Sequence, residues 1–197
     1  MKTPALLAVR RASRRGWNRK HLALYGLGGL LLMVGLLLLL RSATVPTAPL
    51  SGVDFRVVAY QGEDTLGGHE SQFSHVTAQG KPVVLNFFAG QCPPCRAEMP
   101  GFQKIADEFQ GKVIFVGVDI GPYVHLGSHE DAKRLLSELR VRYPAAYAVD
   151  SSPLTIYSVL GMPTTVIFDS KGKVVETHTG ILTEGELRQK LMALAGS

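Results

Sequence analysis

The chain is poor in cysteine, with two among its 197 residues, Cys92 and Cys95, and it has a single tryptophan. Two cysteines cannot build the multiple-disulfide scaffold of a small secreted protein, nor a zinc site made of two cysteine pairs. No segment repeats at a fixed period, which excludes solenoids and propellers. Acidic residues are missing from residues 1–21, and residues 22–40 carry no charge at all.

The excess of positive charge is confined to the N-terminal end. Residues 1–21 hold seven of the 21 lysines and arginines and none of the 16 acids. The net charge of +5 therefore comes from this tail, and the rest of the chain is slightly acidic. Basic residues placed in this way do not form a patch on a folded domain, so we expect no nucleic-acid partner.

Residues 22–40, LALYGLGGLLLMVGLLLLL, have the length and composition of a helix that crosses a bilayer once. A basic flank stays in the cytoplasm. We therefore expect a cytoplasmic tail at 1–21, a signal anchor at 22–40, and a periplasmic body held at the inner membrane of a bacterium. A cleaved signal peptide or a twin-arginine signal at 13–17 is the alternative, although the apolar run is longer than signal peptides usually have. All three interpretations export the body.

Beyond the span, a linker precedes one α/β domain. Residues 41–52, RSATVPTAPLSG, lack any apolar period and are predicted to be the linker. In residues 53–197 strand-like and helix-like segments alternate, and a closing hairpin makes the expected sheet mixed. We expect strands at 55–60, 82–88, 112–120, 145–149, 164–169 and 173–179. We expect helices at 95–109 with a kink at Pro100, at 130–140, and from the Thr183 capping box to about 194, with a second capping box at Ser128 and Asp131. Ser152 and Pro153 are expected to open a further, short helix.

Three interpretations of the Cys92–Cys95 pair are open. A structural metal site needs further ligands, and only His125 and His129 among the six histidines lie at a ligand-like spacing. A structural disulfide would close a loop of few residues, which stabilises a fold little. A redox pair fits best, because Cys92 follows a buried strand and begins a helix, where the helix dipole favours its thiolate.

The expected redox cycle is thiol–disulfide exchange. The exposed Cys92 thiolate attacks a client disulfide, and the more buried Cys95 then resolves the mixed disulfide. Pro93 and Pro94 suit the first helical turn, where a missing N–H costs little. Pro163 stands just before a strand, and a cis bond there would present the Met162 backbone to an extended client segment. By base rate alone a trans bond is the commoner alternative.

The stretches VVLNFFAGQCPPCRAEMP, GMPTTVIFD and GKVVETHTG resemble the thioredoxin superfamily, and within it the membrane-anchored TlpA/ResA-type thiol–disulfide oxidoreductases. The resemblance covers about residues 53–195. It implies a thioredoxin-like three-layer sandwich with an N-terminal strand extension and an insert around residues 120–150. It also implies that Pro163 is a cis-proline that faces Cys92 and Cys95.

The sequence departs from that family pattern beside the cysteines. Phe88 and Gln91 stand where the family usually has tryptophan, which changes the rim that a client meets. Asn86 stands where cytoplasmic thioredoxins carry a buried acid, so another group must accept the Cys95 proton. Glu98, one turn beyond Cys95, is a candidate, but we expect it to be a solvent-exposed charge, as most glutamates are.

The resemblance implies a reductase of client disulfides, such as those of apocytochromes c before haem attachment or of copper-site proteins, supplied with electrons by a membrane thiol carrier. The redox-active disulfide itself would serve as the redox group, with no metal and no other cofactor. A thiol peroxidase shares the fold, but it usually has Thr or Ser three residues before its cysteine, where this chain has Ala89. A copper chaperone of this superfamily typically uses a cysteine spacing one residue longer, plus a distant histidine.

Overall fold

The central strands of the fold are apolar and buried on both faces. The computed structural model describes residues 54–195, which contain one mixed sheet of seven strands. The strands are β1 (Arg56–Gln61), β2 (Glu70–Gln72), β3 (Val83–Phe88), β4 (Ile114–Asp119), β5 (Ala145–Ala148), β6 (Thr164–Phe168) and β7 (Val174–Thr179). They lie side by side in the order β2-β1-β5-β4-β3-β6-β7.

The sheet combines parallel and antiparallel pairs. Every residue of β3 and β4 is buried, and these two strands pair in parallel at the centre, as expected of strands covered by helices on both faces. β5 continues the parallel set beside β4. β6, β7, β1 and β2 all pair antiparallel, so the sheet is mixed, as predicted.

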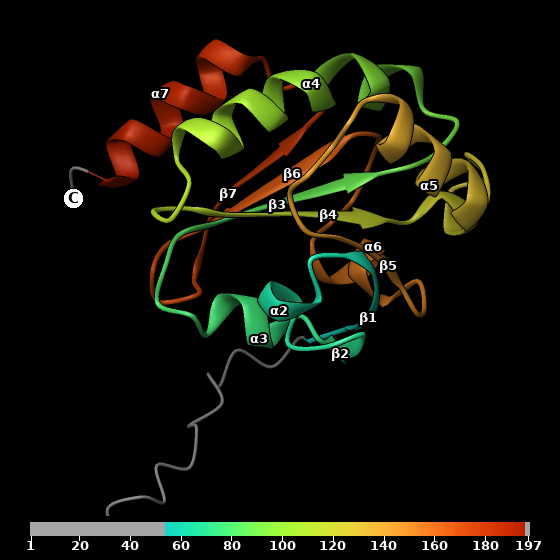
Figure 1. Ribbon diagram of the computed structural model, residues 1–197, viewed down its shortest axis with the longest axis horizontal. Helices are drawn as coiled ribbons and strands as arrows, with labels where there is room; N and C mark the ends of the chain where they lie inside the picture. The colour runs from blue at the N-terminus through green and yellow to red at the C-terminus, as the bar shows by residue number, and fades with distance from the viewer. Residues whose placement is uncertain (1–53, 196–197) are drawn as a thin grey trace, which may run out of the picture. The chain divides into compact units, whose positions relative to one another are not determined.

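Helices cover both faces of the sheet and complete three layers (Figure 1). One face is covered by α4 (Pro93–Glu108), α5 (His129–Glu138) and α7 (Glu184–Ala195), and the other by α2 (Glu63–Leu66), α3 (Ser74–Thr77) and α6 (Ser152–Ile156). Both predicted capping boxes form. The Ser128 side chain accepts the Asp131 N–H, and the Thr183 hydroxyl accepts the Glu186 N–H, while each acid bonds back to its cap residue.

The elements that the sequence did not reveal are short. They are α2, β2, α3 and the 3₁₀ turn η1 (Gly121–Tyr123), each of three or four residues. Elements of that length span about one helical turn or one strand alternation, so the pattern does not repeat and periodicity cannot mark them. Pro100, where a kink was predicted, does not end the helix, since α4 continues through it as one helix of sixteen residues.

Residues 1–53 lie outside the part of the chain that the structure describes. The predicted tail at 1–21, span at 22–40 and linker at 41–52 all fall in that range and stay predictions. Within residues 54–195, no helix has both the length and the apolar character needed to cross a bilayer.

Candidate active site

Cys92 is the N-cap residue of α4 and is joined to Cys95 by a disulfide. Its sulfur accepts the backbone N–H of Cys95 at 3.2 Å, one of the N–H groups that a helix start leaves unpaired. Pro93 and Pro94 occupy the first two helical positions, as predicted, where no intrahelical N–H bond is lost. The sulfur of Cys92 therefore lies where the helix dipole and a backbone donor stabilise negative charge.

The two sulfurs differ little in burial. Cys95 is fully buried, and Cys92 is 3 % exposed. The expectation of an exposed Cys92 is therefore wrong for the disulfide form, although Cys95 is the more buried of the two, as expected. The physical reason is that Cys92 belongs to the apolar cluster on the α4 face of the sheet, against which Met162 also packs.

The Met162–Pro163 peptide bond is cis, as the family resemblance implied. Pro163 is buried just before β6, and its carbonyl accepts the N–H of Gly180 at 2.8 Å. Within residues 54–195, the backbone N–H and carbonyl of Met162 have no hydrogen-bond partner. Met162 can therefore offer both groups to an extended peptide.

Two apolar side chains flank the cis-proline, and the sequence reasoning missed them. Leu160 lies two residues before Met162 and is 89 % exposed, and Ile181 follows Gly180 and is about half exposed. Large apolar side chains this exposed are informative when they gather beside a candidate site. Exposure cannot be read from sequence, which is why the pair escaped detection.

Glu98 is buried, which corrects the expectation of a solvent-exposed charge. It is 4 % exposed, and both carboxylate oxygens accept hydrogen bonds. Asn86 Nδ2 donates to Oε1 at 2.7 Å, and the Leu182 N–H donates to Oε2 at 3.0 Å. Burial raises the pKa of Glu98 to about 7, and the two N–H donors partly offset that rise. Glu98 lies one turn from Cys95 on the buried face of α4, and the segment around Leu182 closes over it.

A carboxyl group with a pKa near 7 can both accept and release a proton at neutral pH. The side chains of residues three apart on a helix are neighbours, so Glu98 lies within the reach of Cys95. Asn86 cannot titrate, but its amide orients the carboxyl group, and it also donates to Thr165 Oγ1 at 3.3 Å. Asn86 and Glu98 thus form a buried, hydrogen-bonded pair of which Glu98 is the titratable member.

The loop before Cys92 rests on the start of α5. Gln91 donates its N–H to the Leu126 carbonyl at 2.7 Å and its side-chain amide to Asp131 at 3.2 Å. Gly90 is so close to this helix that a Cβ atom would lie 2.4 Å from the carbonyl carbon of Asp131. Only glycine fits at position 90, because backbone occupies the space of a side chain.

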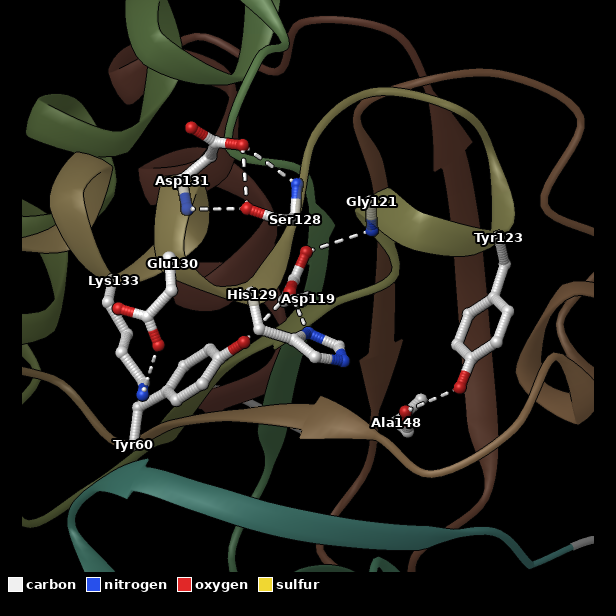
Figure 2. Close-up of polar contacts among 10 residues, drawn as sticks. All are labelled: Tyr60, Asp119, Gly121, Tyr123, Ser128, His129, Glu130, Asp131, Lys133 and Ala148. Carbon is white, nitrogen blue, oxygen red and sulfur yellow. Dashed lines mark hydrogen bonds and ion pairs between the residues drawn. The ribbon is translucent and has the colours of Figure 1, made fainter.

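A buried carboxylate anchors this supporting segment (Figure 2). Asp119, at the end of β4, is fully buried and accepts bonds from the Tyr60 hydroxyl at 2.8 Å, the Gly121 N–H at 2.8 Å and His129 Nδ1 at 2.7 Å. The His129 ring also lies 4.2 Å from the ring of Tyr147, centroid to centroid. These contacts tie the first turn of α5 to β1, β4 and β5. No spacing in the sequence pointed to this cluster.

Metal ligands do not gather at this site in the described part of the chain. Residues 54–195 contain no group of three or more His, Cys, Asp or Glu residues arranged to hold a metal ion. His125 and His129, the pair at a ligand-like spacing, differ in environment, since His125 is exposed and His129 is bonded to Asp119.

Comparison with known proteins agrees with this geometry. Residues 53–177 match the AhpC/TSA family. The thioredoxin-like protein YneN of Bacillus subtilis is 34 % identical over 130 residues, which are 64 % of this chain and 72 % of YneN. The thiol-disulfide oxidoreductase ResA of the same organism is 32 % identical over 107 residues, 54 % of this chain and 57 % of ResA. The chain thus spans less than two thirds of the length of ResA.

The fold also has close counterparts among solved structures. The crystal structure of a DsbE-type thiol:disulfide interchange protein from Chlorobium tepidum aligns with a TM-score of 0.60 at 25 % identity. The alignment covers 75 % of this chain and 94 % of that protein. The chain therefore belongs to the AhpC/TSA family and has its thioredoxin-like fold, with relatives among the ResA-type thiol-disulfide oxidoreductases.

Proposed function

We propose that the chain is a thiol–disulfide oxidoreductase that is tethered to the inner membrane, acts outside the cytoplasm and reduces client disulfides through Cys92 and Cys95. The observation that supports this most directly is the cysteine pair at the start of α4, with the cis Met162–Pro163 bond packed against the same cluster. A thiolate in that position is stabilised by the helix dipole and remains a competent nucleophile near neutral pH.

The reaction proceeds in two exchanges. The Cys92 thiolate attacks one sulfur of the client disulfide, and the other client sulfur leaves as a thiolate. Cys95 then attacks Cys92 in the mixed disulfide, which releases the second client sulfur and forms the Cys92–Cys95 disulfide. Glu98 accepts the Cys95 proton during this step, since its pKa of about 7 matches the task. Two electrons pass to the client, and a membrane thiol carrier, itself oxidised to a disulfide, supplies two further electrons that reduce the Cys92–Cys95 disulfide again.

Client binding rests on the segment around the cis-proline. An extended client strand pairs with the unpartnered backbone groups of Met162, which aligns its sulfur with Cys92. Two exposed side chains near this segment offer apolar contact: Leu160, two residues before Met162, and Ile181, which follows the Gly180 that bonds to Pro163. Gln91 stands where the family usually has a tryptophan, directly before the first cysteine. The surface that surrounds Cys92 therefore suits a different set of client side chains.

The proposed clients are oxidised C-x-x-C-H segments of apocytochromes c, by similarity to the ResA-type relatives, or cysteines of copper-site proteins. The reductive direction follows from the same similarity. Direction is set by the reduction potential of the pair against that of the compartment.

A redox titration of the full chain in detergent tests this proposal. A midpoint of about −250 mV or lower fits a reductant, whereas one near −120 mV would make the protein an oxidant. A Cys95→Ser variant expressed in the native cell should trap clients as mixed disulfides on Cys92. A Cys92→Ser variant, which lacks the nucleophile, is the matched control and should trap none.

A thiol peroxidase is the second candidate, because the family that the chain matches is AhpC/TSA. Ala89 supplies no hydroxyl three residues before Cys92. A rate of peroxide consumption that depends on Cys92 and exceeds the rate of disulfide exchange would favour the peroxidase. Copper that stays bound through dialysis and is lost in Cys92→Ser would instead favour a role in copper-site assembly.

A further inference from the structure

Two buried polar atoms beside Glu98 are unpartnered. Within residues 54–195, the Tyr143 hydroxyl and Asn86 Oδ1 are the buried side-chain polar atoms without a hydrogen-bond partner. Tyr143 is 5 % exposed and Asn86 is 1 % exposed. Leaving such a group unpaired costs about 1–3 kcal/mol, so a pair of them in one place calls for a functional explanation.

The two atoms belong to the same face of the sheet. Asn86 on β3 pairs with Gly117 on β4, so the Asn86 side chain and a Cβ placed on Gly117 would point to the same face of the sheet. A Cβ atom on Gly117 would lie 3.3 Å from Cε2 of Tyr143, which places the tyrosine ring directly over that position. Burial raises the pKa of Tyr143, and the negative charge of Glu98 raises it further, which places the hydroxyl within electrostatic reach of the carboxyl group.

Tyr143 also lines a surface cleft. The cleft has a volume of about 370 Å³, and Gln103, Asp107 and Arg142 line it together with Tyr143, whereas neither cysteine does. The Gln103 side chain accepts the backbone N–H of Tyr143 at 3.3 Å and that of Arg142 at 2.6 Å, which fixes the tyrosine in this wall. Tyr143 therefore belongs both to the buried cluster around Glu98 and to the wall of this cleft.

We propose that Tyr143 is a positioning residue that, with Asn86, holds one water molecule against Glu98 and links that carboxyl group to the cleft behind the active site. The proposal rests on the oxidoreductase function proposed above. The Tyr143 hydroxyl is a donor and Asn86 Oδ1 is an acceptor, so one water that also donates to Glu98 satisfies both and makes three bonds, as buried waters typically do.

The link serves the second exchange. A client in mixed disulfide with Cys92 covers the cysteine side of the site, so a proton cannot leave from there. The Cys95 thiol gives its proton to Glu98 as the Cys95 sulfur bonds to Cys92 and the client sulfur leaves with the electron pair. Glu98 then passes the proton through the water to the cleft, and Tyr143 stays neutral throughout.

Few titratable or charged groups near Glu98 could take or release the Cys95 proton in its place. Within residues 54–195, Tyr143 is the titratable group whose pKa responds to the charge of Glu98, and Cys95 lies one turn before Glu98 among the buried residues of α4. Asn86 from β3 and the Leu182 N–H are polar and do not titrate. Within residues 54–195, no lysine or arginine forms an ion pair with Glu98.

The test follows both exchanges in the full chain in detergent, with dithiobis-nitrobenzoate as the disulfide. The reduced protein should release two equivalents of thionitrobenzoate, the first by Cys92 attack and the second by Cys95 resolution. In the wild type the second phase should become faster as pH rises through the Glu98 pKa of about 7, because the carboxylate form accepts the Cys95 proton. Tyr143→Phe loosens the water that stabilises the Glu98 carboxylate, so this inflection should rise by about 0.5–1 pH unit. The second phase should then be roughly three- to tenfold slower below pH 7, with the first phase unchanged.

Tyr157→Phe is the matched control, since Tyr157 packs on the opposite face of the sheet and should leave both phases unchanged. An unshifted second-phase inflection in Tyr143→Phe would overturn the role of Tyr143 while the proposed function stands. A wild type that releases no second equivalent would overturn both. Nuclear magnetic resonance of the wild type adds a readout that needs no variant, because the Tyr143 hydroxyl proton should show a cross-peak to one bound water, and its absence would also overturn the proposal.

Discussion

Asn86 donates a 2.7 Å hydrogen bond to Glu98 although neither residue reaches solvent, and they come from different layers of the fold, β3 and α4. The bond joins the strand that leads to the cysteines with the helix that begins at them. It also fixes a carboxyl group with a raised pKa one helical turn beyond Cys95. The first two predictions follow from this relationship.

Glu98 should make the stability of the protein depend on pH. Its pKa is 4.5 in an unfolded chain and about 7 in the fold. Between these values the folded state binds more protons, so the free energy of unfolding should fall as pH rises from about 4.5 to 7, by roughly 3 kcal/mol in all. Below pH 4.5 Glu98 is protonated in both the folded and the unfolded state, so the free energy of unfolding no longer changes through this group. Urea unfolding at several pH values measures it, and in Glu98→Gln this part of the slope should vanish.

Asn86→Ala should raise the Glu98 pKa further. The variant removes the donor at Oε1, so the buried carboxylate loses a hydrogen bond that favours its charged form. We expect a loss of about 1–3 kcal/mol in the free energy of unfolding at pH 8, and less at pH 5, where Glu98 is protonated. Thr165→Val provides the comparison, because it removes the other Asn86 contact and leaves Glu98 bonded. An equal loss at both pH values would contradict this account.

The sequence predicted the parts of this site that depend on local pattern, and it failed where contacts join distant segments. The capping box at Ser128 and the helix start at Cys92 each lie within four residues of sequence, so their patterns are visible. The burial of Glu98 depends on Leu182, which lies 84 residues later and donates to its carboxylate. No local pattern reports such a contact. The cis bond at Pro163 came from family resemblance alone, since base rates favoured trans.

The Asp119 cluster failed to appear in the sequence for the same reason. Tyr60 lies 59 residues before Asp119 and belongs to an edge region of the sheet. An aspartate at the end of a strand is ordinary in sequence, and only the fold shows that three donors surround it.

Asp119→Asn should therefore destabilise the fold and loosen the loop before Cys92. The amide keeps one acceptor oxygen but brings an NH₂ group against the donors from Tyr60, Gly121 or His129, so at least one bond is lost in a fully buried place. We expect a loss of about 2–4 kcal/mol in the free energy of unfolding. Asp150→Asn changes an exposed carboxylate that accepts the Ser152 N–H at the start of α6, and it should lose less than about 1 kcal/mol by the same urea measurement.

Gly90→Ala should slow the reaction of Cys92. The new Cβ atom would meet the backbone of Asp131 and Ala132 within 2.5 Å, so the loop or the start of α5 must move. We expect a clear loss of stability, of about 1–3 kcal/mol, and a slower first exchange with a small disulfide. Gly185→Ala is the control within the same chain, since nothing lies within 4 Å of its Cβ position in α7. Alanine there should stabilise the protein by up to about 1 kcal/mol and leave the exchange rate unchanged.

Leu160 should contribute to client binding without contributing to stability. Its side chain is 89 % exposed, so Leu160→Ser removes almost no buried contact and should change the free energy of unfolding by less than about 0.5 kcal/mol. A peptide client with apolar residues beside its disulfide should lose about 1–2 kcal/mol of binding, seen as a roughly five- to thirtyfold rise in KM. Reduction of a small disulfide that cannot reach Leu160 should keep its rate. Met192→Ser, which changes an exposed apolar side chain on α7, should leave KM for the same peptide unchanged, and an equal rise there would show that the effect does not arise at the cis-proline.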